Sequence, residues 1–321
     1  MKIFKNLAFV LLLTTTSIVG AANEALLSEI IDKAKVSESD SLVIIENGQT
    51  VYSEFYGVPD QVRNVQSITK SVAALAIGIL LDEAKISSLD LPLSQWLPVW
   101  ANDSVKSRIT LRMVLNHTSG ILDSQFKDFF GNPDLVATAR GANATGVGER
   151  FEYSSVAVSL LQTVIEQASG QKVETFVKDK ILMPLEIFDF FWNKDKAGNE
   201  ALSGGLGLNS ESLAKLGQLV LQEGSYKGRQ IIKATTLRLM LTKSQNYKSY
   251  GLLWWLQRPT GDTNPNNYQL FSAWGWGGQY IVVYPAKKLI AVRTKNPTSI
   301  VNDKFAVQEF SEFRSLIGKW Q

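Results

Sequence analysis

Residues 67–81 read SITKSVAALAIGILL, and this stretch decides the fold. Beyond the first four residues, its side chains are almost all apolar or small and would cover every side of a helix. A helix that is apolar all round is typical of one enclosed by the rest of the protein, since a surface helix keeps a polar face. We therefore predict a helix over residues 67–81 at the centre of the molecule.

Strand-forming patterns lie near both ends of the chain. Residues 42–45 and 51–56 are rich in β-branched and aromatic side chains, and the Asn47-Gly48 pair between them is a strong hairpin signal. Further strands are predicted over residues 251–256, 268–273, 280–284 and 289–294. An opening and a closing helix are predicted over residues 24–35 and 303–316.

The middle of the chain has helical periodicity. Predicted helices cover residues 111–116, 155–168, 173–182, 210–222 and 234–241. This arrangement indicates the α+β fold class: an antiparallel sheet built from the N- and C-terminal segments, flanked by helices, with an all-helical domain inserted. We expect an α/β lobe over about residues 22–66 and 245–321, and a helical lobe over about residues 67–244.

The N-terminus has the layout of a secretory signal peptide. Lys2 and Lys5 precede an apolar run from Leu7 to Leu13, and small residues end the segment at 19–22. The apolar run is too short to span a bilayer, although a retained N-terminal anchor is the alternative. We expect a signal peptide over residues 1–21, a domain over residues 22–321, and a periplasmic or secreted protein without a membrane span after cleavage.

The composition narrows the class of partner. The 321 residues are 45% hydrophobic, which suffices for a sizeable core, and the lack of cysteine excludes disulfides. The formal net charge of +3 includes Lys2 and Lys5, so cleavage would leave +3 − 2 = +1. No basic run provides an electrostatic footprint for nucleic acid or an anionic membrane. We expect a small, roughly neutral molecule as the partner, and the oligomeric state stays open.

Ser67-Ile68-Thr69-Lys70 matches the S-x-x-K pattern. Positions i and i+3 share a helix face, so the lysine amine would lie beside the serine hydroxyl. A lysine can take the proton of that hydroxyl if burial or another cation lowers the lysine pKa. Backbone N–H groups in the first turn of a helix also point toward a developing oxyanion. The pattern indicates a nucleophile and its base, and a chance match on the surface is the alternative.

A second match to the pattern occurs at residues 212–215, SLAK. Apolar residues at helical spacing surround it, at Leu213, Leu216, Leu219 and Val220. We predict that this copy lies on the solvated polar face of a peripheral amphipathic helix and carries no chemistry.

Two further stretches contain candidate residues. In residues 148–155, GERFEYSS, Tyr153 stands at a turn before an apolar helix, where a phenol near a lysine can shuttle a proton. A half-buried core tyrosine is the alternative. In residues 273–279, AWGWGGQ, glycines allow close approach of a ligand, and an N–H at the strand end can donate to an oxyanion. A plain glycine-rich hairpin is the alternative.

The order of these three stretches resembles the serine β-lactamases and penicillin-binding proteins. In that superfamily a nucleophile motif, a tyrosine motif and a glycine-bearing motif follow one another, as residues 67–70, 153–155 and 273–275 do here. Residues 115–120, LNHTSG, and 275–280, GWGGQY, also look like the class C-type branch, which includes esterases and 6-aminohexanoate-oligomer hydrolases. The resemblance covers nearly the whole mature chain and implies a β-lactamase/transpeptidase-like fold.

The resemblance implies a role for each matching residue. Ser67 would form the acyl-enzyme, Lys70 would activate it, and Tyr153 would transfer protons to the leaving group and from water. The backbone N–H groups of Ser67 and Trp276 would form the oxyanion hole. Substrate contacts would come from Ser155, Trp274, Gly275 and Trp276. No cofactor and no metal is implied.

Two positions depart from the pattern of the superfamily. The tyrosine motif usually ends in Asn but ends here in Ser155, which still donates one hydrogen bond. The third motif usually begins with a cationic residue but begins here with Ala273, so a partner for a substrate carboxylate is lost. Trp274 and Trp276, together with Tyr250, would instead make an apolar wall suited to an ester or a small amide.

An exported serine hydrolase acting on small esters or amides is therefore expected, and the alternatives have different chemistries. A penicillin-binding protein or weak class C-like β-lactamase would act on a β-lactam-like substrate. A catalytically silent module of the same fold would bind without turnover. A Ser-His-Asp enzyme would have to use His117, the single histidine, which we expect to be a hydrogen-bonded structural residue. One histidine and no cysteine also leave only carboxylates to complete a zinc site.

Overall fold

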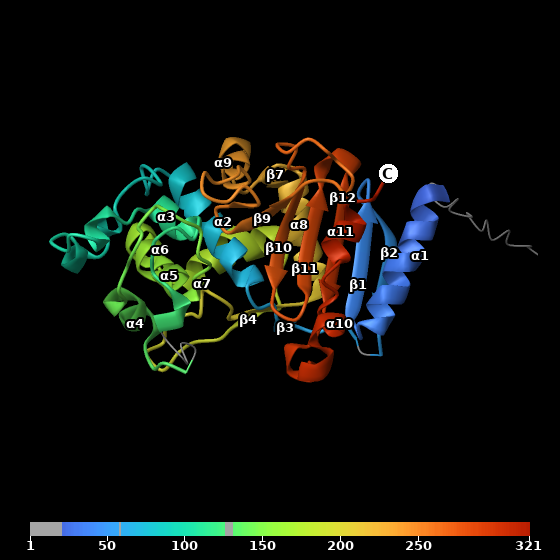
Figure 1. The fold of residues 1–321 in the computed structure, drawn as a ribbon, viewed down its shortest axis with the longest axis horizontal. Helices are drawn as coiled ribbons and strands as arrows, with labels where there is room; N and C mark the ends of the chain where they lie inside the picture. Colours follow the sequence, from blue (N-terminus) through green and yellow to red (C-terminus); the bar gives the residue numbers. More distant parts are fainter. Residues whose placement is uncertain (1–20, 58, 126–130) are drawn as a thin grey trace, which may run out of the picture.

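The computed structural model describes residues 21–57, 59–125 and 131–321 (Figure 1). The predicted signal peptide lies outside the described residues, apart from Ala21. Within the described ranges, no helix combines the length and the apolar character needed to cross a membrane.

A seven-stranded antiparallel sheet joins the two ends of the chain, in the order β2-β1-β12-β11-β10-β9-β8. Ser41 of the first strand lies opposite Thr294 of the last. The strands are β1 (Ser41–Glu46), β2 (Gln49–Phe55), β8 (Tyr250–Gly251), β9 (Trp254–Gln257), β10 (Leu270–Gly275), β11 (Gln279–Tyr284) and β12 (Leu289–Thr294). The prediction of an antiparallel sheet built from both terminal segments is confirmed.

The predicted hairpin connects β1 to β2. Asn47 and Gly48 have φ angles of +52° and +77°. A tight turn of this kind needs the left-handed conformation at both central positions, and Asn followed by Gly adopts it most readily.

The strand predicted over residues 251–256 is interrupted. Leu252 and Leu253, with φ angles of +36° and +67°, form a turn between β8 and β9. The helical region holds this turn, because Leu252 N donates to Asn116 Oδ1 and Leu253 N donates to Leu115 O, both at 2.9 Å. These long-range hydrogen bonds outweigh the local strand propensity of the apolar run.

The predicted closing helix is also divided. It consists of α10 (Phe305–Glu309) and α11 (Phe313–Ile317), separated at Phe310, whose φ is +56°. Phe310 is buried and packs against Phe313, so burial of the ring accompanies the break.

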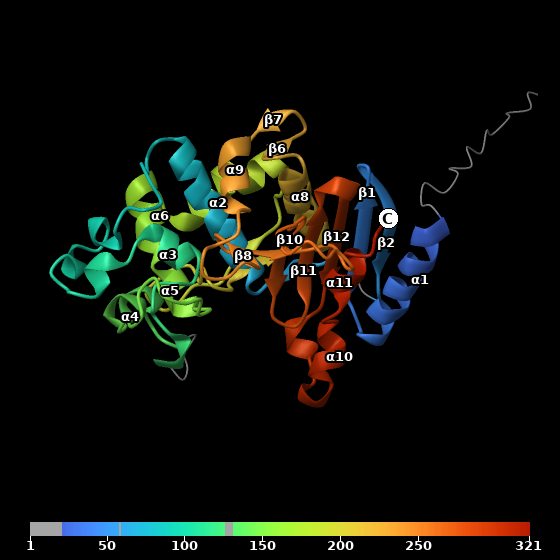
Figure 2. The same cartoon turned by 45° about the horizontal axis from the view of Figure 1, so that its top comes forward.

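The helix α2 (Ile68–Asp82) runs through the centre of the molecule, as predicted (Figure 1 and Figure 2). Against it pack α6 (Leu161–Ser169), α7 (Val173–Val177) and α9 (Ala234–Met240). Further out, α3 (Leu111–Leu115) and α4 (Leu135–Gly141) pack against α5 (Ser155–Ser159). The helix predicted over residues 155–168 is divided at Leu160 into α5 and α6. The helix predicted over residues 173–182 ends in a π-helical turn, Lys178–Leu182.

Both faces of the sheet are covered by helices. On one face, α1 (Ala21–Val36) and α11 enclose an apolar cluster that includes Leu42 and Ile44. On the other face, α8 (Ser210–Leu221) packs against β11 and β12. Gly217 permits this approach, because a Cβ there would lie 2.7 Å from Ile290 Cγ2. Residues 210–221 were expected in the helical lobe, and they cover the sheet instead.

A small three-stranded sheet brings distant segments to the start of α2. In it, β5 (Leu206–Leu208) lies between β3 (Arg63–Asn64) and β4 (Phe191–Trp192). A separate hairpin is formed by β6 (Ser225–Tyr226) and β7 (Arg229–Gln230). The small sheet places Asn64 and the loop after β4 beside the N-terminus of α2.

Candidate active site

Ser67 precedes α2 as its N-terminal cap residue, and Lys70 lies in the first turn of this helix. Lys70 Nζ donates a hydrogen bond to Ser67 Oγ at 2.9 Å. Lys70 is 1% exposed, so the packing around α2 separates its side chain from bulk water. The spacing from i to i+3 has therefore produced the predicted contact between amine and hydroxyl.

Two other groups surround Lys70 Nζ. This atom also donates to the backbone carbonyl of Ser203 at 2.5 Å and lies 4.9 Å from the centre of the Tyr153 ring. The structure thus brings Ser67, Lys70 and Tyr153 together, as the sequence predicted. The contact with Ser203 was missed, because a backbone carbonyl that is distant in sequence leaves no residue pattern.

A carboxylate positions the segment that carries Tyr153. Asp123 accepts hydrogen bonds from the backbone N–H groups of Ser155 and Val156, each at 2.9 Å. It also accepts one from Ser154 Oγ at 3.2 Å. The first N–H groups of a helix lack partners within the helix, so a carboxylate is stabilised there. The sequence does not predict these contacts of Asp123, because no local motif connects Asp123 to Tyr153.

Trp276 follows β10 at a turn that lies close to Ser67. Gly275 allows this approach, because a Cβ there would collide with the backbone carbonyl of Val65. The next residues, Gly277 and Gly278, have φ angles of +78° and +83°. Arg293 Nη1 donates to their carbonyl groups at 3.1 and 2.7 Å. The buried Arg293 guanidinium therefore stabilises the turn that carries the Trp276 N–H.

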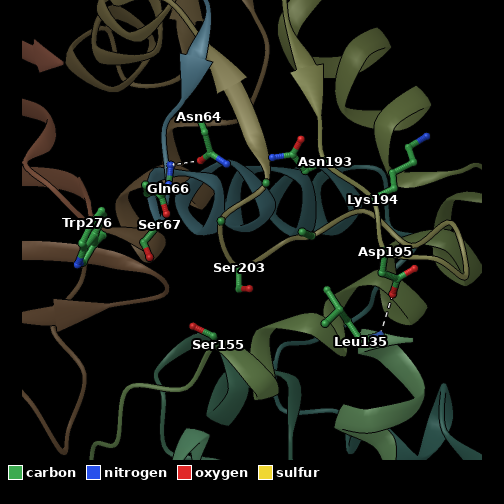
Figure 3. A pocket seen from close by; sticks show the side chains of 13 residues that line it. Asn64, Gln66, Ser67, Leu135, Ser155, Asn193, Lys194, Asp195, Ser203 and Trp276 are labelled. Atoms are coloured by element: carbon green, nitrogen blue, oxygen red, sulfur yellow. Dashed lines mark hydrogen bonds between the residues drawn. The ribbon is translucent and has the colours of Figure 1, made fainter. Parts of the chain in front are cut away.

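Ser67 and Trp276 line two cavities. The first, of about 550 Å³, is lined by several polar side chains, including those of Asn64, Asn193, Ser155 and Ser203. Figure 3 shows Ser155 and Ser203 beside this cavity, and the carboxamides of Asn64 and Asn193 pointing toward one another. The second cavity, of about 320 Å³, is aromatic and is also lined by Tyr153, Trp255, Trp274 and Glu309.

The family of the chain follows from its sequence. The sequence model of the Beta-lactamase family matches residues 27–303, a range that includes α2, Tyr153 and β10. The chain belongs to the Beta-lactamase family. It therefore lies within the superfamily of serine β-lactamases and penicillin-binding-protein-like enzymes, and the predicted resemblance is confirmed.

Relatives of this Beta-lactamase-family protein include hydrolases of more than one kind. The chain is 22% identical over 219 residues to the 6-aminohexanoate-dimer hydrolase of Paenarthrobacter ureafaciens, covering 60% of this chain and 55% of the relative. It is 25% identical over 178 residues to the esterase EstB of Burkholderia gladioli, covering 46% of this chain and 45% of the relative.

The fold of this Beta-lactamase-family protein is similar to solved structures. A penicillin-binding protein homologue from Caulobacter crescentus superposes with a TM-score of 0.69, covering 93% of this chain and 98% of that one. The two sequences are 17% identical, so this likeness concerns the fold alone.

The apolar wall of this Beta-lactamase-family site contains Trp255 in place of the predicted Tyr250. Tyr250 was expected to line the wall, but it is 1% exposed and its Oη lies 3.1 Å from His117 Nε2, behind the Tyr153 ring. Trp255 takes its place, with its ring stacked at 6.1 Å from that of Tyr153. The turn at Leu252 and Leu253, which the sequence did not predict, determines which aromatic residues of this segment face the cavity.

His117 is a buried, hydrogen-bonded residue in this Beta-lactamase-family protein, as predicted. Its Nδ1 accepts from Ser154 N at 3.1 Å, which leaves Nε2 to donate to Tyr250 Oη. Its ring centre lies 4.4 Å from that of Tyr153. His117 therefore supports Tyr153 and its loop through packing and hydrogen bonds.

Replacing His117 will reduce stability much more than turnover. His117→Ala leaves Ser154 N and Tyr250 Oη without their partner and opens a cavity, so we expect a loss of about 3 kcal/mol of unfolding free energy. The folded variant will retain most of its ester turnover. Complete loss of turnover in a folded His117→Ala protein would identify a catalytic histidine instead.

The same residue makes stability depend on pH. Burial, with a smaller contribution from the Lys70 charge, holds the pKa of His117 well below its usual range. Below about pH 6.5 the unfolded chain binds a proton that the folded protein does not, so the folded state loses about 1.5 kcal/mol between pH 6.5 and 5. Urea unfolding at both pH values measures this loss, which the His117→Ala variant should lack.

The second S-x-x-K copy of this Beta-lactamase-family chain does not form a serine–lysine pair. Lys215 donates to Glu186 O at 2.9 Å and forms an ion pair with Glu211 at 3.0 Å. Ser212 is 5% exposed, so the prediction of a solvated position is wrong for this residue. The cause is the location of α8, which packs against the sheet and is covered on more of its surface than a peripheral helix.

Proposed function

We propose that the protein is an exported serine hydrolase that acts on small esters or amides through an acyl-enzyme at Ser67. The observation that carries the proposal is the 2.9 Å contact between Lys70 Nζ and Ser67 Oγ, buried beneath two cavities that both reach Ser67. The signal-peptide pattern of residues 1–21 supports export, which N-terminal sequencing of the mature protein checks.

In the proposed reaction, the Lys70 amine accepts the Ser67 proton while Ser67 Oγ forms a bond to the substrate carbonyl carbon. The backbone N–H groups of Ser67 and Trp276 stabilise the oxyanion. When the bond to the leaving group breaks, Tyr153 donates a proton to that group and recovers one from Lys70. Water then forms a bond to the acyl carbon and gives up a proton to Tyr153. That proton passes through Lys70 to Ser67 Oγ as the bond between Oγ and the acyl carbon breaks, and the acid is released.

Esters and small amides are favoured over β-lactam antibiotics as substrates. Ala273 is buried at the position where the resemblance places a cation for a substrate carboxylate, and aromatic side chains line the cavity beside it. Relatives named as an esterase and as a 6-aminohexanoate-dimer hydrolase agree with this choice, and one named as a putative D-alanyl-D-alanine carboxypeptidase corresponds to the penicillin-binding alternative.

Covalent labelling tests the proposal. The mature protein and its Ser67→Ala variant are incubated with a fluorophosphonate probe, a chromogenic short-chain ester and a chromogenic cephalosporin. We expect an adduct on Ser67 by mass spectrometry and ester turnover, both absent from Ser67→Ala.

The other outcomes have distinct meanings. Efficient cephalosporin turnover, or a stable acyl-enzyme with penicillin, would favour the β-lactamase or penicillin-binding alternative. A folded protein that no probe labels at Ser67 would overturn the catalytic assignment and favour a binding module of the same fold.

A further inference from the structure

The two cavities that meet at Ser67 are lined by different kinds of side chain. On one side the lining includes the polar side chains of Asn64, Asn193, Ser155 and Ser203, and on the other it is aromatic, with Trp255 and Trp274. Ser67 and Trp276 belong to both sides, so a carbonyl group attacked by Ser67 would lie at the boundary. The two groups on either side of the substrate carbonyl would therefore contact different kinds of side chain.

The polar cavity offers hydrogen-bond donors. Asn64 Oδ1 already accepts from Gln66 N at 2.7 Å, so its Nδ2 is the atom left to donate. The Ser203 hydroxyl is buried and has no hydrogen-bond partner among the described residues. The carboxamide of Asn193 also lines this cavity and points toward that of Asn64 (Figure 3). A buried polar group gains most from a ligand that supplies its missing partner.

The charged side chains beside the polar cavity already have partners. Lys194 forms ion pairs with Glu174 at 2.7 Å and with Glu200 at 3.5 Å. Asp195 accepts hydrogen bonds from Leu135 N and from the Asn199 side chain. The cavity therefore favours a neutral group with hydrogen-bond acceptors over an ion.

The aromatic cavity offers flat apolar surfaces. The rings of Trp255 and Trp274 lie 5.3 Å apart, and the Arg314 guanidinium packs 4.8 Å from the centre of the Trp274 ring. Glu309 also lines this cavity, and Arg314 and Arg293 are close enough to oppose its charge. A planar apolar group can stack on these rings without needing a charge of its own.

Tyr153 determines which half of the substrate enters each cavity. In the proposed function it protonates the leaving group, and it lines the aromatic cavity together with Ser67. The polar cavity contains Ser155 rather than Tyr153. The leaving group must lie within reach of its proton donor, so it belongs on the aromatic side.

We infer, on the basis of the proposed function, that the substrate is a neutral ester or amide whose leaving group carries an aromatic ring and whose acyl group carries a hydrogen-bond acceptor. The aromatic cavity receives the leaving group and the polar cavity receives the acyl group. Asn193 and Trp274 determine the specificity on the two sides.

Four esters test this division: benzyl and methyl esters of methoxyacetic acid and of butyric acid. Methoxyacetyl and butyryl groups have nearly the same size, but the first carries an ether oxygen as acceptor. Values of kcat/KM are measured by proton release for the wild type, for Asn193→Leu and for Trp274→Leu. A preference is the ratio of the kcat/KM values of two esters. Because the same two esters are compared in each protein, their intrinsic reactivities cancel.

Asn193→Leu should lower the preference for methoxyacetyl over butyryl by about fivefold and leave the preference for benzyl over methyl unchanged. Trp274→Leu should lower the preference for benzyl over methyl by about tenfold and leave the preference for methoxyacetyl over butyryl unchanged. If either protein does not unfold cooperatively, Asn193→Ala and Trp255→Leu repeat the test.

A reversed pattern, or variants that alter both preferences equally or neither, would overturn the division. If Ser67 is labelled but none of the four esters is hydrolysed faster than by Ser67→Ala, the inferred substrate class is wrong and the acyl-enzyme chemistry stands. If Ser67 is not labelled at all, the proposed function itself fails, and this inference fails with it.

Discussion

Replacing Lys70 with methionine will lower kcat/KM for an ester by about a thousandfold and leave the protein folded. The loss in rate is expected because Ser67 then lacks the base that takes its proton, and general-base catalysis contributes roughly 10²–10⁴-fold. The fold should persist because the Lys70 side chain is buried, and methionine is an unbranched apolar side chain that fills most of the same volume.

The second S-x-x-K copy supplies a matched control for this experiment. Lys215→Met removes a lysine from the same four-residue pattern, at a site where the amine contacts Glu186 and Glu211 rather than a serine hydroxyl. We expect ester turnover close to that of the wild type. Ester turnover of Lys70→Met that matches this control, in protein with an unchanged melting temperature, would rule out Lys70 as the base.

Replacing Arg293 with methionine will lower the unfolding free energy by about 3–5 kcal/mol and will also reduce kcat. The guanidinium is fully buried and donates to the carbonyl groups of Gly277, Gly278, Glu309, Ser37 and Gln308, and to the hydroxyl group of Ser39. Burial lowers the pKa of Arg293 to about 10, so it remains a cation at neutral pH. Its removal leaves several buried acceptors without a donor.

The effect on kcat follows from the turn that Arg293 holds. Gly277 and Gly278 come directly after Trp276, whose N–H is the proposed oxyanion donor, so a displaced turn weakens that hydrogen bond in the transition state. We expect kcat to fall about tenfold with a smaller change in KM, and Arg293→Lys to recover part of the activity. Urea unfolding and ester kinetics measure both effects. A folded Arg293→Met protein with wild-type kcat would contradict the positioning role.

Much of the fold could be predicted because its main elements have strong local patterns. The buried helix α2, the hairpin at Asn47-Gly48 and the strands β11 and β12 follow directly from apolar runs and turn residues. The elements that were interrupted, at Leu252–Leu253 and at Phe310, depend on packing against distant segments. A local pattern cannot predict a break that is stabilised by a residue far along the chain.

The candidate site also combines features that the sequence predicts with features that depend on distant contacts. Ser67 and Lys70 could be paired from the sequence because three residues separate them on one helix. Tyr153 and Trp276 were predicted through a resemblance in the order of motifs, since nothing in their spacing requires them to meet. Asp123, Trp255 and Asn193 were not predicted at all, because each reaches the site from a different segment.

The sequence by itself determined the fold class, the central helix and the contact between the Ser67 hydroxyl and the Lys70 amine, because helix geometry and burial patterns act over a few residues. Only the tertiary structure decided which side chains line the two cavities and that Arg293 holds the turn after Trp276. These features depend on contacts between segments that are far apart in the chain, and such contacts form only when the sheet, α2 and the helical region pack together.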